Sequence, residues 1–372
     1  MLRAISVEEK QIRAVVDIFQ IEGEFKSFEL IQSGHINATY KVYIERHGEL
    51  KDYIVQRVNM YVFQNPEAVM YNIAGVTEFI RKKIKETGVS AKRYVLHYAK
   101  TAGGDYFAVL PDGGFWRCCR FIDGSKSFLF PENEKIVEEA GKAFGEFQRY
   151  LSDYPVDDLK IVIPHFHNTV MRYEAFKNAV EKDAVRRRVW IEEEIAGYLE
   201  LEEIATRLYK MQKRGELPLR VTHNDTKTSN VLFDEETSEH LSVIDLDTVM
   251  PGLIAFDFGD AIRIAANTGA EDEQDLNNVN VDMAKFEAFT RGFVGKVGDM
   301  LTENEKATLA LGAVAMTVEC GMRFLTDYLD GDKYFKIHYE EQNLVRARCH
   351  LALARKMIER LDEMQAIVCK YC

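Results

Sequence analysis

The stretch Val-Thr-His-Asn-Asp-Thr-Lys-Thr-Ser-Asn-Val-Leu-Phe-Asp occupies residues 221–234, and Leu-Ser-Val-Ile-Asp-Leu-Asp follows at residues 241–247. Three polar residues in it, Asp225, Asn230 and Asp245, stand next to short apolar runs that are typical of buried strands joined by a hairpin. Phosphoryl transfer needs such a set in this order. The stretch predicts that Asp225 accepts the proton of an attacking hydroxyl group, whereas Asn230 and Asp245 bind the Mg²⁺ ions that bridge the phosphates of ATP.

A purely structural explanation of the same stretch is a hairpin with Asp and Asn in turn positions, which these residues favour. That explanation does not account for polar residues at the ends of apolar strands. Further along, residues 257–259 spell Asp-Phe-Gly, the magnesium-binding tripeptide of protein kinases. They follow the turn signal Met-Pro-Gly at 250–252 rather than the hairpin strand. We therefore assign the metal to Asp245 and expect Asp257 or Asp260 to cap a helix or to bond to the backbone of the catalytic loop.

Composition excludes several classes of protein. The net charge of −12, without a basic stripe, argues against a nucleic-acid partner. The longest apolar runs are far shorter than the roughly 20 residues of a membrane span, and the N-terminus lacks the apolar core of a secretory signal. Six cysteines in 372 residues indicate reduced thiols, so we expect a cytoplasmic protein. We also expect a monomer whose two lobes close over ATP.

The secondary-structure pattern changes once along the chain. Residues 27–122 are rich in β-branched and aromatic residues, interrupted by one amphipathic stretch at 66–85. From Phe130 onward the apolar residues recur with helical spacing; we expect helices at about 171–183, 185–214 and 282–366. The predicted fold class is α+β, a bilobal protein-kinase-like fold. Its N-terminal lobe (1–122) would be a small mixed β-sheet that covers the nucleotide, and its C-terminal lobe (123–372) mainly helical, with the catalytic loop and the substrate site.

The catalytic stretch resembles the aminoglycoside phosphotransferase and choline kinase superfamily, and within it the chain looks most like bacterial N-acetylhexosamine 1-kinases. The similarity runs nearly end to end, and its most specific segments are Arg-Val-Thr-His-Asn-Asp-Thr-Lys at 220–227, Ile-Asp-Leu-Asp-Thr at 244–248, Phe-Asp-Phe-Gly-Asp at 256–260 and Glu-Cys-Gly-Met-Arg-Phe-Leu at 319–325. The resemblance implies transfer of the γ-phosphoryl group of ATP to the anomeric hydroxyl group of GlcNAc or GalNAc. It gives Asp225, Asn230 and Asp245 the same roles that the motif predicts.

The expected nucleotide site departs from other kinases in two ways. Gln56 stands where strand alternation predicts the small-lobe lysine, so the contact to the α- and β-phosphates is open, and Lys227 could serve near the γ-phosphate. The covering loop at 33–37, Ser-Gly-His-Ile-Asn, has a single glycine. Its His35 and Asn37 either reach the phosphates or the sugar, or form the polar tip of a hairpin turn. No P-loop motif occurs, so the P-loop NTPases are excluded.

The resemblance also supplies the remaining site residues. Besides Asp225, it implies that His35, Arg323 and Tyr334 bind the sugar, since a neutral sugar needs hydrogen-bonding groups and a flat apolar face. Arg323 lies on an apolar helix, where either a structural salt bridge or a ligand would satisfy it. We expect the adenine to bind the backbone near residues 120–122, where Phe121 and Ile122 follow the last strand of the sheet.

Two other functions fit the sequence. One is a kinase of the same fold that acts on another small alcohol, such as a different sugar position, an amino alcohol or an aminoglycoside. A choline-type site needs an aromatic cage, and Arg323 at the expected site argues against a cationic substrate. The other is a nucleotide-binding scaffold without catalysis, which would require the loss of Asp225, Asn230 or Asp245, and all three are present.

Overall fold

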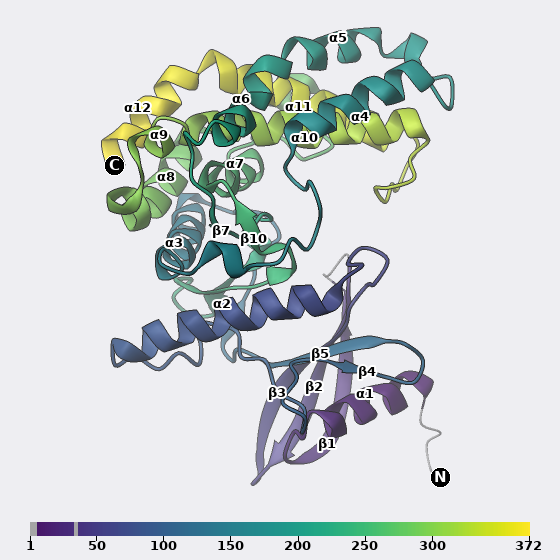
Figure 1. Ribbon diagram of the computed structural model, residues 1–372, viewed down its shortest axis with the longest axis vertical. Coiled ribbons are helices and arrows are strands. Elements are labelled where there is room, and N and C mark those ends of the chain that lie inside the picture. The colour runs from purple at the N-terminus through teal and green to yellow at the C-terminus, as the bar shows by residue number, and fades with distance from the viewer. Residues whose placement is uncertain (1–5, 33–35) are drawn as a thin grey trace.

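The computed structural model describes residues 6–32 and 36–372, and Figure 1 shows a sheet below a larger group of helices. The sheet has the strand order β1-β2-β3-β5-β4, and every ladder in it is antiparallel. The bounds are β1 Glu24–Ile31, β2 Ala38–Arg46, β3 Glu49–Arg57, β4 Ala108–Val109 and β5 Phe115–Arg120. The expected fold class is confirmed, but the expectation of a mixed sheet is wrong: short connections join β1 to β2, β2 to β3 and β4 to β5, and the long connection at 58–107 returns the chain so that β5 is antiparallel to β3.

Two helices cover the two faces of this sheet. α1 (Val7–Ile18) packs its apolar side chains against one face, where alternate residues of β2 such as Val42 and Ile44 are fully buried. α2 (Pro66–Glu86) belongs to the core on the other side, which continues into the helical part. Within the strand-rich part of the sequence, residues 94–99 form only an isolated bridge, from Tyr98 to Cys119. We call the sheet with α1 and α2 the sheet lobe, and the rest of the chain the helical lobe.

The helical lobe is built around α10 (Leu309–Asp330), which is buried along nearly its whole length. By length and composition α10 could span a membrane, but 89% of its apolar window is buried inside the protein, as in the core helix of a folded lobe. The expected helix at 185–214 is divided into α5 and α6. The other helices are α3 Glu134–Tyr150, α4 Thr169–Lys182, α5 Glu192–Glu200, α6 Glu202–Lys213, α7 Ile254–Ala265, α8 Met283–Val297, α9 Glu303–Lys306, α11 Gln342–Glu359 and α12 Leu361–Tyr371.

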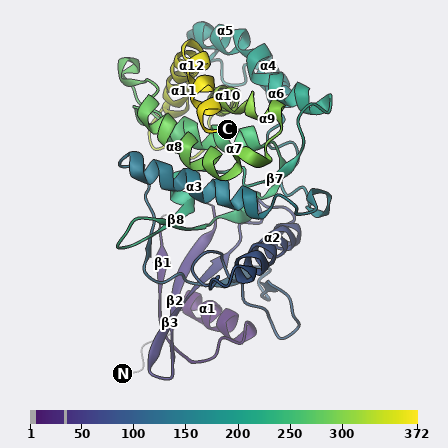
Figure 2. The same cartoon turned by 90° about the vertical axis from the view of Figure 1, so that its left-hand side faces the viewer.

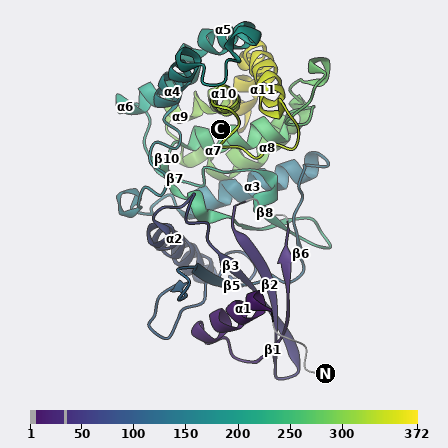
Figure 3. The same ribbon diagram turned by 90° about the vertical axis from the view of Figure 1, so that its right-hand side faces the viewer.

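Short strands lie between the helices and the sheet lobe. β7 (Arg220–Thr222) pairs with β10 (Met250–Gly252), and β8 (Val231–Asp234) pairs with both β9 (His240–Val243) and β6 (Ser125–Lys126). In the side view of Figure 3, β7 and β8 are below the helices and above the sheet. In Figure 2, α3 separates α8 from the sheet lobe. The hairpin that the sequence predicts is therefore present, at the junction of the two lobes.

A close contact between helices α7 and α10 supports this junction. α7 and α10 meet at two glycines, and a Cβ atom on Gly259 would lie 2.1 Å from the carbonyl oxygen of Gly312. A Cβ atom on Gly312 would lie 2.0 Å from the carbonyl oxygen of Ala255. Only glycine permits two backbones to pack this closely. This close packing holds α7 against the loop that follows β7.

Candidate active site

The loop after β7 presents Asp225 together with two nitrogen donors. Lys227 Nζ lies 2.8 Å from Asp225 Oδ2, and Asn230 Nδ2 donates to the same oxygen at 3.0 Å. Asn230 Nδ2 also donates to the backbone oxygen of Asp225 at 2.9 Å, which closes the loop on itself. Asn224, just before Asp225, adopts a left-handed conformation with φ of 63°. The sequence thus brings Asp225, Lys227 and Asn230 into one hydrogen-bonded group.

The charges of this group stabilise one another. Burial alone would raise the pKa of Asp225, but the adjacent Lys227 ammonium lowers it below its ordinary value. In the same way, Asp225 outweighs the effect of burial on Lys227 and raises the pKa of the ammonium. At neutral pH the pair is therefore ionised. An ionised carboxylate is an acceptor of hydrogen bonds only, so Asp225 can receive the hydroxyl group of a substrate.

Two buried aspartates of α7 accept hydrogen bonds from the backbone of this loop. Asp257 accepts the backbone N–H groups of His223 and Asn224 at 2.9 and 2.8 Å. Asp260 accepts the backbone N–H of Thr226 at 2.9 Å. The prediction that Asp257 or Asp260 bonds to the backbone of the catalytic loop is confirmed, for both residues. The Asp-Phe-Gly sequence at 257–259 is part of a helix, as its position after a turn indicated.

Asp245 lies at the end of the hairpin in a left-handed conformation, with φ of 60° and ψ of 56°. Its carboxylate and the side-chain oxygen of Asn230 accept no hydrogen bond from any residue that the structure describes. Although solvent reaches Asp245, crowding by the protein desolvates its carboxyl group; with the nearby charges of Asp247 and Asp225, this raises its pKa to about 6. Carboxylate and amide oxygens are ligands that Mg²⁺ prefers. The donor set of Asn230 and Asp245 therefore fits Mg²⁺.

A second polar network, which sequence reasoning missed, joins the sheet lobe to the hairpin. Arg117 of β5 binds Asp247 with both ends of its guanidinium group; the Nη2–Oδ2 distance is 3.1 Å. Arg117 Nε donates to Gln56 Oε1 at 2.9 Å, and Asn37 Nδ2 donates to Asp247 Oδ2 at 2.7 Å. Arg117 and Asp247 are 2% and 3% exposed. The available sequence signals were an arginine in the middle of a mostly apolar strand and a second aspartate two residues after Asp245.

The expected adenine site has two backbone groups without partners. The N–H of Phe121 donates to Asp52 O at 3.0 Å, and the carbonyl oxygen of Ile122 accepts Ser125 Oγ at 2.6 Å. The carbonyl oxygen of Phe121 and the N–H of Ile122 have no hydrogen-bond partner within residues 6–32 and 36–372. One acceptor and one donor, adjacent in the chain, are therefore free at the end of β5.

Arg323 and Tyr334 lie together in the helical lobe. The guanidinium carbon of Arg323 is 5.8 Å from the ring centre of Tyr334, 5.4 Å from that of Phe335 and 5.9 Å from that of Phe166. Arg323 is half-buried and makes no hydrogen bond or ion pair with the described residues. Of the two explanations that the sequence left open for this arginine, the salt bridge is thus not found in the described part of the chain. His35 lies outside the described residues.

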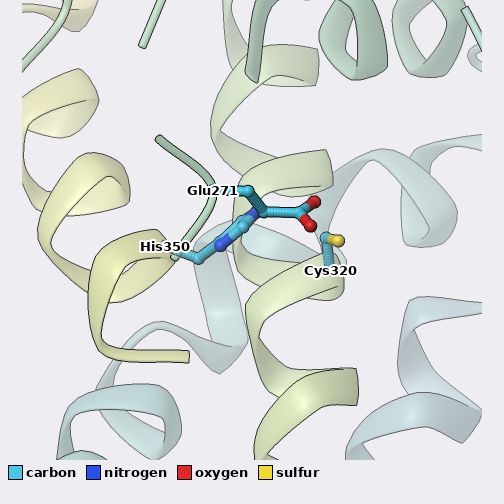
Figure 4. Close-up of side chains that lie close together, drawn as sticks. All are labelled: Glu271, Cys320 and His350. Atoms are coloured by element: carbon cyan, nitrogen blue, oxygen red, sulfur yellow. The ribbon is translucent and has the colours of Figure 1, made fainter. Parts of the chain in front are cut away.

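Glu271, Cys320 and His350 form a further group in the helical lobe, and Figure 4 shows their side chains together. Their ligand atoms lie within 4.8 Å of one another. The carboxylate of Glu271, however, is 3.6 Å from the guanidinium groups of both Arg263 and Arg346, which would repel a metal ion. Burial raises the pKa of the Cys320 thiol to about 11, which disfavours a thiolate ligand. We assign no metal to this group.

Comparison with known proteins places the chain in a family. The model of the phosphotransferase enzyme family, APH, matches residues 27–289. Among solved structures, the microcompartment-associated aminopropanol kinase has a TM-score of 0.60 at 13% identity, with 96% of this chain and 98% of that one covered. An aminoglycoside phosphotransferase from Alicyclobacillus acidocaldarius subsp. acidocaldarius has a TM-score of 0.62 at 11% identity, with 96% of both chains covered.

A third similar structure was determined with its ligands. Spectinomycin phosphotransferase, in complex with ADP and spectinomycin, has a TM-score of 0.55 at 14% identity, with 94% of this chain and 98% of that one covered. At these identities the three structures bear on the fold, and all of them span nearly the whole chain. The match to the family model covers well over half of the residues. The chain belongs to the APH phosphotransferase family, whose members are nucleotide-dependent kinases of small molecules.

Proposed function

We propose that the protein is an ATP-dependent kinase that phosphorylates the anomeric hydroxyl group of N-acetylhexosamines, GlcNAc and GalNAc, to give the sugar 1-phosphate. The observation that carries the proposal is the group around Asp225. The ionised carboxylate of Asp225 is hydrogen-bonded to Lys227 and to Asn230, and Asn230 is one of the two candidate metal ligands. The other candidate ligand, Asp245, follows the hairpin. The sugar class rests on the end-to-end resemblance in sequence and on the surroundings of Arg323.

Asp225 acts on the hydroxyl group that attacks the γ-phosphorus. The new bond joins the sugar oxygen to phosphorus, the bond from phosphorus to the β–γ bridging oxygen breaks, and the sugar proton passes to Asp225. A carboxylate whose pKa lies below the ordinary value of about 4 cannot remove this proton beforehand. It orients the hydroxyl group and takes the proton late, as a loose transition state allows. Most of the acceleration then comes from positioning and charge neutralisation.

The nucleotide would lie between the lobes. Mg²⁺, when bound by Asn230 and Asp245, neutralises charge on the phosphates. Lys227 supports the γ-phosphate, since its ammonium remains protonated beside Asp225. The carbonyl oxygen of Phe121 and the N–H of Ile122 belong to one trans peptide group and point in opposite directions, so one of them, and not both, would bind the edge of adenine. Direct nucleotide contacts of His35, Asn37 and Gln56 stay predictions.

The sugar would lie against Arg323 and Tyr334. A sugar presents hydroxyl and acetamido oxygens as acceptors, and a guanidinium group offers five donors in a fixed fork. The rings of Tyr334, Phe335 and Phe166 around Arg323 supply flat apolar surface. Tyr334 is 71% exposed, so a ligand can reach it. An unpaired cation at this position disfavours the amine substrates of the alternative function, a kinase of amino alcohols or aminoglycosides. The cytoplasmic location and the monomeric state also stay predictions.

A coupled ADP-release assay with ATP and Mg²⁺ tests the proposal across GlcNAc, GalNAc, glucose, galactose, choline and kanamycin. NMR of ³¹P and ¹H then locates the phosphate in any product. Phosphate on the anomeric carbon of an N-acetylhexosamine is the expected result. Phosphate at another position, or turnover of the amines alone, would overturn the sugar assignment and favour the alternative substrates. The Asp225→Asn variant controls for contaminating kinases.

A further inference from the structure

Gln56 stands on β3 where strand alternation predicts the small-lobe lysine of kinases, whereas Lys51 of the same strand pairs with the exposed Glu49. Gln56 is directly opposite Thr39 on β2 and Arg117 on β5. Its amide nitrogen donates to Thr39 Oγ1 at 3.0 Å, and its amide oxygen accepts Arg117 Nε at 2.9 Å. Both ends of the Gln56 side chain are therefore committed to neighbouring strands. In the cross-strand row of Thr39, Gln56 and Arg117, the cation is Arg117, which lies on the strand beside β3.

Arg117 forms an ion pair across the junction of the two lobes. It is fully buried in the sheet lobe, and its carboxylate partner Asp247 belongs to the segment that follows the hairpin of the helical lobe. Asn37 supports the same carboxylate at 2.7 Å. Asn72 of α2 donates to the backbone oxygen of Val249 at 2.8 Å, two residues further on. Three side chains of the sheet lobe thus hold residues 247–249, directly after Asp245.

The backbone of Asp245 needs such support from both sides. A left-handed conformation is uncommon for a residue other than glycine, and it persists only where the surroundings impose it. On the upstream side, Ile244 N donates to Asn230 O at 2.9 Å, and the oxygen of Ile244 is 2.9 Å from His223 Nε2. On the downstream side, the charged contact is the ion pair of Asp247 with Arg117, beside the neutral hydrogen bonds from Asn37 and Asn72. Loss of the ion pair leaves Asp247 without its cation and this flank of Asp245 with neutral hydrogen bonds.

We propose that Arg117 is a positioning residue: through Asp247 it holds the Asp245 carboxylate in the orientation that binds the metal of Mg·nucleotide. Arg117 touches neither the nucleotide nor the substrate, because all of its polar nitrogens face Asp247, Gln56 and the sulfur of Met70. Through its ion pair with Asp247 it links the sheet lobe to the candidate metal site. The inference rests on the proposed function only in requiring that the protein binds Mg·ATP.

The test is the gain in ADP affinity that Mg²⁺ produces, measured by isothermal titration calorimetry with MgCl₂ and again with EDTA. Arg117→Lys keeps the positive charge but loses the bidentate contact with Asp247, and Arg117→Met loses both the charge and the contact. We expect both variants to bind ADP in EDTA as the unmodified protein does, since the free groups of Phe121 and Ile122 are unchanged. With Mg²⁺ we expect their affinity to be about 10–100-fold lower, as for other residues that orient a metal ligand.

Glu305→Gln is the matched control for loss of stability. Glu305 is 2% exposed and binds Arg220 through both carboxylate oxygens, at 2.5 and 2.8 Å, within the helical lobe. This variant should lower the unfolding temperature without changing the Mg²⁺-dependent gain. Arg117 variants that keep the gain, or that lose ADP affinity equally with and without Mg²⁺, would overturn the inference. If the unmodified protein shows no Mg²⁺-dependent ADP binding, the proposed function fails, and the inference fails with it.

Discussion

The carboxylate of Asp257 accepts the backbone N–H of His223 at 2.9 Å, so a helix that begins at Ile254 fixes the catalytic loop that follows β7. The second oxygen of Asp257 accepts Asn224 N at 2.8 Å, and Gln148 Nε2 donates to the first at 2.7 Å. Three donors therefore converge on one buried carboxylate. The position of Asp225 therefore depends on this arrangement as well as on the contacts of its own side chain with Lys227 and Asn230.

Asp257→Asn should impair both stability and turnover. The new amide nitrogen would face a backbone N–H, which leaves a buried donor without an acceptor at a cost of about 1–3 kcal/mol. We expect denaturant unfolding to give that loss in free energy and kcat to fall, while KM for ATP changes little. Asp299→Asn is the control, because Asp299 is 70% exposed and surface pairs contribute at most about 1 kcal/mol. Equal effects of the two substitutions would contradict the bracing role of Asp257.

Asp225→Asn should remove turnover and spare the nucleotide. An amide of the same size still accepts a hydrogen bond but cannot take the proton of the attacking hydroxyl group, so we expect kcat to fall by about 10²–10⁴-fold. Calorimetry with ADP and Mg²⁺ should show binding close to that of the unmodified protein, since Asn230 and Asp245 remain. A variant that keeps the original kcat would exclude Asp225 as the base.

The catalytic stretch was predictable because its signals are local. Asp225, Asn230 and Asp245 follow one another within 21 residues, and the alternation of apolar and polar residues shows where each strand ends. The role of Asp257 was also predictable, because a turn signal separates it from the hairpin. The ion pair between Arg117 and Asp247 joins residues 130 positions apart, and no spacing rule indicates which distant charges will meet when the lobes pack.

The direction of the strands was not predictable for a related reason. Periodicity identifies a strand and its buried face, but pairing is decided by how the connections fold back. The segment at 94–99 has strand-like composition, and yet it forms a single bridge, from Tyr98 to Cys119. Gln56 hydrogen-bonds to Thr39 and Arg117 of the two neighbouring strands, and the alternation of residues within β3 alone does not identify such partners.

Arg323→Met should weaken binding of the sugar alone. Hydrogen bonds to a charged group contribute about 1.5–3 kcal/mol, so we expect KM for GlcNAc to rise by about 10–100-fold with KM for ATP unchanged. The unfolding temperature should hardly change, because Arg323 has no carboxylate partner among the described residues. Arg348→Met, which removes a surface partner of Glu194, is the control. A rise in KM for both substrates, or for neither, would contradict the sugar contact.

His240 should make stability depend on pH between about 6.5 and 9. Its ring lies 2.6 Å from Glu139 and 3.2 Å from Glu146, whose own contacts are Lys142 and Lys296. Burial would lower the pKa of His240, but the two carboxylates raise it to about 9. The folded protein thus binds a proton that the unfolded chain, with a pKa near 6.5, releases. The stabilisation is complete below pH 6.5 and is lost as the pH rises towards 9, by up to about 1.4 kcal/mol per unit.

Urea unfolding at several pH values from 6.5 to 8.5 measures this slope. The carboxylates do not contribute there, because the pKa values of Glu139 and Glu146 are lowered to about 2 and their stabilisation is lost only in acid. His240→Asn should remove the slope, whereas His47→Asn should keep it. His47 is exposed, and its φ of 55° suits asparagine. A slope that survives in His240→Asn would assign the pH dependence to other groups.

Two glycine substitutions in helices should change stability in opposite directions. Gly312→Ala places a methyl group 2.0 Å from the carbonyl oxygen of Ala255, so α7 must move, at a cost of about 1–3 kcal/mol. Because α7 carries Asp257, kcat should fall as well. Gly295→Ala lies in α8 with nothing within 4 Å of the added carbon, and should stabilise the protein by up to about 1 kcal/mol without changing kcat. Unfolding curves and kcat of the two variants, measured side by side, separate helix propensity from packing. A Gly312→Ala variant as stable and as active as Gly295→Ala would show that the close contact of α7 with α10 does not position the catalytic loop.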